Sequence, residues 1–144
     1  MNNKQYNEYI EKRAERSPCI TNCIKAFFVG GLICLLGEGF SEFYVYLGAE
    51  KENALIYASL TLIFIAGLFT GIGVFDKIAK FGGGGALVPI TGFSNSVASP
   101  AIESKSEGYT TGVASKMFTI AGPVIVFGIF SSIIYGIIYY LSIM

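Results

Sequence analysis

The chain has 144 residues, of which 53% are apolar and only 14% are charged, well below the charged fraction of about 25% in an average soluble protein. Its ten basic and ten acidic residues cancel, so the charge balance gives no reason to expect a nucleic-acid partner. Histidine is absent, which removes the commonest general base and the commonest metal ligand. The composition favours a single membrane domain with the lipid bilayer as its surroundings.

Residues 1–17 are polar and charged, and we expect them to form a short amphipathic or frayed cytoplasmic helix. Ser17 and Pro18 then predict a helix start, with serine as the cap and proline at the first helical position. The first predicted membrane span covers residues 20–47, which is long enough to cross about 30 Å of hydrocarbon.

Two carboxylates lie in the outer half of this span, at Glu38 and Glu42. They are four residues apart and therefore share one helix face. An ionisable residue inside a span is a candidate for a solute pathway, because its burial in lipid is costly. Glu38 stands between two glycines, which would let water or a partner approach it. Glu42 is nearer to an aromatic belt, and simple solvation is the alternative for it.

The second and third spans are predicted at residues 54–75 and 117–141. The second contains Gly67 and Gly71, at the GxxxG spacing that allows close helix packing. The third should kink or begin anew at residues 122–123, a Gly-Pro pair. A second helix-packing stripe of small residues lies on the third span, at Gly128, Ser132 and Gly136.

Between these spans, residues 81–103 form a segment that cannot be a plain membrane helix. It has no charge before Glu103, yet it contains five glycines and two prolines, which are poor helix formers. Irregular backbone is tolerated at membrane depth only inside protein or along a water-filled cavity. We therefore predict two half-helices joined near residues 89–93, which enter the membrane and line a pathway.

Two alternatives for this segment remain open. Its glycines serve either a pathway or only close packing between subunits, and its polar residues either line the pathway or cap the second half-helix. The pathway and gating candidates are Gly83, Gly84, Pro89, Ser94, Asn95 and Ser96.

The basic residues predict the orientation, because cytoplasmic loops carry an excess of lysine and arginine. Residues 1–23 hold four basic residues and residues 76–80 hold two, whereas none follows Tyr140. We expect a cytoplasmic N-terminus and a C-terminus across the membrane, which requires residues 81–103 to re-enter on one side. Four full spans with both termini cytoplasmic are the alternative.

A resemblance to a known family adds to this interpretation. The block FGGGGALVPITGFSNSVASPAIESKSEG, followed by KMFTIAGPVIVFG, resembles the signature of the stage V sporulation protein AC family, and SPCITNCIKAFFVGGLICLLGEG resembles the first span of that family. The homologous AE family shares a looser version of the block. The resemblance implies a SpoVA channel or transporter subunit that moves dipicolinic acid, as its calcium chelate, across the forespore and spore inner membrane in sporulation and germination.

The resemblance also implies partners, namely the other SpoVA membrane subunits and a soluble dipicolinate-binding subunit, and self-association is compatible with it. It implies no catalytic residue, and we expect no enzyme activity, no cofactor and no metal centre. A calcium-bearing solute would suit the carboxylates of the first span, and a dianion would suit basic residues at the cytoplasmic mouth. These basic candidates are Lys77, Lys80 and Lys105. The alternative function is a non-conducting structural or docking subunit of the same complex.

Overall fold

In a computed structural model of the chain, Tyr6 and residues 18–143 are described. This part of the chain is helical throughout apart from short turns, and it contains no strand. The prediction of an all-α membrane protein is confirmed, with three helices long and apolar enough to cross a membrane. Of the predicted N-terminal helix, only Tyr6 belongs to the described residues, and it is helical.

Two long helices form an antiparallel pair. Helix α2 (Cys19–Tyr46) and helix α3 (Lys51–Gly71) are joined by a short turn at residues 47–50 and pack along each other. The Tyr44 hydroxyl lies 2.8 Å from that of Thr61 across the pair. The buried residues of α3 are all alanines, Ala54, Ala58 and Ala66, because small side chains let neighbouring helices approach closely.

The sequence places a helix start at Pro18, and the structure agrees to within one residue. Pro18 occupies the N-cap position and α2 begins at Cys19, so the proline is not the first helical residue as predicted. The predicted cap, Ser17, lies outside the described residues.

The broken segment, residues 81–103, contains the two predicted helices, and a further helix precedes them and ends at Gly82. In chain order the three helices are α4 (Phe75–Gly82), α5 (Gly84–Leu87) and α6 (Ile90–Glu103). One break falls at Gly83 and the other at residues 88–89, where Pro89 has an extended backbone before α6 begins. The break at Pro89 falls at the first residue of the join predicted near residues 89–93, and the residues after it are helical.

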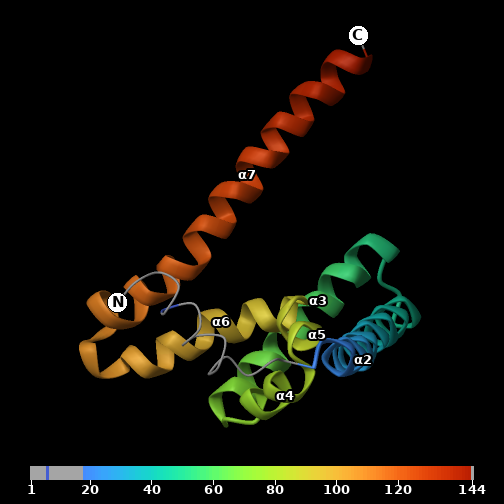
Figure 1. The fold of residues 1–144 in the computed structure, drawn as a ribbon. Helices are drawn as coiled ribbons and strands as arrows, with labels where there is room; N and C mark the ends of the chain where they lie inside the picture. Colours follow the sequence, from blue (N-terminus) through green and yellow to red (C-terminus); the bar gives the residue numbers. More distant parts are fainter. Residues whose placement is uncertain (1–5, 7–17, 144) are drawn as a thin grey trace.

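The last helix stands apart from the others. A 3₁₀ helix, η1 (Ser104–Glu107), and a π-helix, η2 (Tyr109–Ala114), lead into α7 (Ser115–Ile143). Helix α7 is continuous through Pro123, so the alternative of a new helix start at residues 122–123 is wrong. Figure 1 shows α7 projecting away from the rest of the molecule, and no residue of α7 is buried within the described chain.

The packing of the broken segment defines its place in the fold. Helices α4 and α5 pack on the N-terminal half of α2, and α6 packs along α3 (Figure 1). The segment is therefore surrounded by the chain's own helices on these sides, as its irregular backbone requires.

Candidate functional site

Two glycines hold the broken segment against α2. A methyl group added at Gly82 would lie 2.7 Å from Cγ1 of Val29, and one added at Gly85 would overlap the backbone carbonyl of Ala26. No side chain fits at this distance, so these positions need glycine for a close backbone approach. These close approaches lie within one chain, whereas the packing alternative placed them between subunits, so packing between subunits stays a prediction.

The two glycines chosen from the sequence, Gly83 and Gly84, are placed differently. Gly83 has φ +50° and ψ −127°, a conformation that residues with a side chain rarely adopt. A methyl group at Gly84 would meet nothing within 4 Å. Of the two glycines selected from the sequence, Gly83 is needed for its backbone angle, whereas Gly84 has space for a side chain. Gly82 and Gly85, which make the close contacts with α2, were not among those selected. A run of four glycines gives no signal that separates these roles.

Polar groups join α6 to α3. The Ser94 hydroxyl donates a hydrogen bond of 2.8 Å to the backbone carbonyl of Ile63. The Thr70 hydroxyl lies 3.0 Å from Oδ1 of Asn95 and 2.7 Å from the carbonyl of Ala66, and its single hydrogen serves one of these oxygens at a time. Hydrogen bonds between a polar side chain of one helix and a neighbouring helix stabilise helix packing inside a membrane.

The capping alternative for these polar residues is wrong. Helix α6 begins at Ile90 with Pro89 at the N-cap position and no side-chain cap, so Ser94 and Asn95 lie inside the helix. Ser96 donates to the carbonyl of Phe93 within the same helix.

A polar crevice lies where α3, α4 and α6 meet. It has a volume of about 360 Å³ and is lined by Thr70, Gly73, Asp76, Ala79, Asn95, Ser99, Ile102 and Glu103. Asp76 forms an exposed ion pair of 2.7 Å with Lys80, and Ser99 donates to Glu103 over 3.1 Å. Asp76 precedes the broken segment and Glu103 ends it, so both ends of the segment lie at the same end of the α2–α3 pair.

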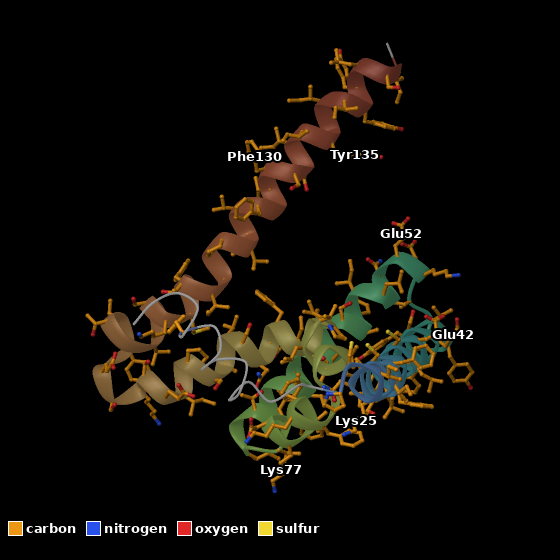
Figure 2. All side chains as sticks on the ribbon, viewed as in Figure 1. Lys25, Glu42, Glu52, Lys77, Phe130 and Tyr135 are labelled. Carbon is orange, nitrogen blue, oxygen red and sulfur yellow. The ribbon has the colours of Figure 1, made fainter. Side chains whose placement is uncertain are left out.

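The predicted carboxylate site is separate from this crevice. Glu38 and Glu42 are both exposed, and neither lines the polar crevice. Figure 2 shows Glu42 near the end of α2 where it meets α3, and Lys77 on α4 on another side of the molecule. The structure thus brings Lys80 to Asp76 but does not bring the basic candidates to Glu38 or Glu42.

The predicted packing stripes have only one partner within the chain. A methyl group at Gly67 would lie 3.6 Å from the Ser94 hydroxyl, so Gly67 faces α6. A methyl group at Gly71, Gly128 or Gly136 would meet nothing within 4 Å in the described part of the chain. Helix α7 contacts α6, and a packing role of Gly128, Ser132 and Gly136 stays a prediction.

The described residues contain no group of three or more histidine, cysteine, aspartate or glutamate side chains that would hold a metal ion. The oxygen atoms of the polar crevice are hard ligands, which suit transient contact with a cation.

Comparison with known proteins gives the family. Residues 22–138 match the family described as SpoVAC/SpoVAEB sporulation membrane protein. The chain belongs to this family. It is 45% identical over 136 residues to the stage V sporulation protein AC of Bacillus subtilis (strain 168), an alignment that covers 94% of this chain and 91% of that protein. The resemblance seen in the central block is thus confirmed. No solved structure matches the chain.

Proposed function

We propose that this chain is a conducting subunit that moves dipicolinic acid, as its calcium chelate, across the inner membrane of the forespore and spore. Membership of a sporulation membrane family supports the setting, and the resemblance to the AC family supports the solute. The other SpoVA membrane subunits and a soluble dipicolinate-binding subunit are the proposed partners. We propose no catalytic step.

The observation that carries this proposal is the shared crevice of Asp76 and Glu103. Both ends of the segment lie at this crevice, and its middle packs against α2 and α3. This is the form of a re-entrant loop. Broken helices of this kind line solute pathways in channels and transporters, because their ends and free backbone groups face the pathway.

The charges around the segment suit a metal chelate of a dianion. Asp76 and Glu103 offer carboxylate oxygens to a cation. Lys77 and Lys105 are exposed near the same end and offer positive charge to an anionic group. Their proposed role is to hold the two halves of the solute at the mouth.

A specific observation favours the docking alternative. Gly82 and Gly85 fix α4 and α5 tightly to α2, and α7 contacts α6 but buries no residue within the described chain. A subunit of this form would serve as a scaffold whose broken segment does not open.

Reconstitution separates the two functions. The chain alone, in vesicles loaded with calcium dipicolinate, should release the solute, measured as terbium luminescence outside the vesicles. The docking function is supported by two results together. The chain alone releases no solute, and the partner subunits give full release even with a chain whose broken segment carries a substitution.

A further inference from the structure

A second crevice, apolar and distinct from the polar one, lies between the helices at the centre of the molecule. It has a volume of about 240 Å³ and contacts α2, α3, α4 and α6. Ala66, Phe75 and Thr91 close its inner end, with exposed fractions of 2%, 3% and 6%. Leu36 and Phe69, at 47% and 39%, stand at its mouth.

The chemistry of the crevice excludes a polar ligand. Its lining side chains are apolar except for Thr91, whose hydroxyl donates to the carbonyl of Ala86 over 3.3 Å. No buried side-chain nitrogen or oxygen among the described residues lacks a hydrogen-bond partner. An apolar cavity of this kind holds no ordered water and accepts apolar molecules.

The depth of the crevice indicates which apolar molecule fills it. Ile33 lines it at the midpoint of α2 (Cys19–Tyr46), and Leu62 lines it next to the midpoint of α3 (Lys51–Gly71). If these helices cross the bilayer, the crevice extends from the centre of the hydrocarbon layer toward the end of α3, where Phe69, Phe75 and Ile78 line it. A lipid acyl chain reaches that depth, because each leaflet supplies half of the about 30 Å core.

Size separates an acyl chain from a neighbouring helix. One turn of α-helix, about 10 Å across and 5.4 Å long, fills roughly 400 Å³, more than the whole crevice. The crevice is also smaller than the about 300–1,000 Å³ of sites for drug-sized molecules. A hydrocarbon chain is narrower than the about 10 Å of a helix, so a part of one chain can occupy the crevice.

We propose that this crevice, between α2, α3, α4 and α6, is a binding site for one acyl chain of a membrane lipid. The chain would contact Phe75 and Ile78 of α4 together with the mid-span residues of α2 and α3. Lipid would thereby form part of the packing surface of the broken segment. The site does not depend on which solute the protein passes.

The absence of tryptophan from the sequence allows a direct test. Phe69→Trp places a single fluorophore at the mouth of the crevice, and Phe64→Trp places one at an exposed position of α3 that does not line it. The full chain in detergent is titrated with a phospholipid that carries bromine, a fluorescence quencher, on its acyl chains. With about one lipid per chain, we expect at least twofold quenching of Phe69→Trp and little change in Phe64→Trp. Equal quenching of both, or none at Phe69→Trp, overturns the proposal.

Filling the crevice provides a second measurement that needs no tryptophan. Ile33→Phe and Leu36→Phe should each reduce, at least severalfold, the lipid that purifies with the chain, measured by mass spectrometry. Leu68→Phe, an exposed residue outside the crevice, is the matched control and should leave the retained lipid unchanged. The proposal is overturned if a folded Ile33→Phe or Leu36→Phe variant retains as much lipid as the unchanged chain. It is also overturned if a second copy of the chain covers the crevice and protects Phe69→Trp from quenching by the lipid.

Discussion

Asp76 and Glu103 line the same crevice from α4 and α6, although the whole broken segment separates them along the chain. Between them the chain passes along α2, turns at Pro89 and returns along α3. This relationship ties the local sequence of glycines and prolines to the proposed topology. A segment with both ends at one place contributes no net crossing.

Gly85 should be the least replaceable residue of the glycine run. Gly85→Ala brings a methyl group into the backbone of Ala26, and overpacking of this kind costs about 1–3 kcal/mol. Gly84→Ala is the control, because its methyl group meets no neighbour and alanine favours a helix over glycine by about 1 kcal/mol. Thermal unfolding in detergent should show a lower midpoint for Gly85→Ala and an unchanged or higher one for Gly84→Ala. Equal midpoints would mean that α5 does not press on α2.

Ser94 should contribute more to the α3–α6 contact than Ser96. Ser94→Ala removes the hydrogen bond to Ile63, worth about 0.5–1.5 kcal/mol, whereas Ser96→Ala removes a bond within α6 alone. The midpoint of thermal unfolding in detergent should fall for Ser94→Ala and stay unchanged for Ser96→Ala. The same midpoint for both variants would argue that close packing at Gly67, not the hydroxyl, holds the two helices together.

The carboxylates of the polar crevice should affect passage of a calcium chelate more than passage of a free dianion. Asp76→Asn with Glu103→Gln removes two negative charges from the crevice, and we expect a severalfold loss of calcium dipicolinate release from vesicles. Glu52→Gln, on the exposed first turn of α3, is the control. Equal effects on the chelate and on calcium-free dipicolinate would exclude a cation contact at this crevice.

Glu38 remains a pathway candidate, although it is exposed and lies outside both the polar and the apolar crevice. If it faces a pathway, another subunit or a second copy must provide the opposite wall. Glu38→Gln should then change solute release in the assembled complex and leave membrane insertion intact. Normal release by Glu38→Gln in the full complex would assign the residue to topology or packing.

Much of the fold followed from simple patterns, because long apolar runs without charge predict membrane helices with little dependence on context. The details of the broken segment did not. Gly83 has a positive φ and Gly85 approaches Ala26 closely because of the way α4 and α5 meet α2. The sequence shows only a run of identical glycines, so it does not tell these two roles apart. Asp76, Thr70 and Ser99 were also missed, because they become a site only when α6 lies along α3.

The re-entrant topology is tested most directly by cysteine accessibility. In a chain lacking Cys19, Cys23 and Cys34, single cysteines replace Lys105 after α6 and Ser142 near the end of α7, and each is labelled by a membrane-impermeant reagent from one side at a time. The account predicts that Lys105→Cys reacts from the cytoplasmic side, as a cysteine at Lys77 does, and that Ser142→Cys reacts only from the far side. Labelling of Lys105→Cys from the far side would contradict it and favour four full spans.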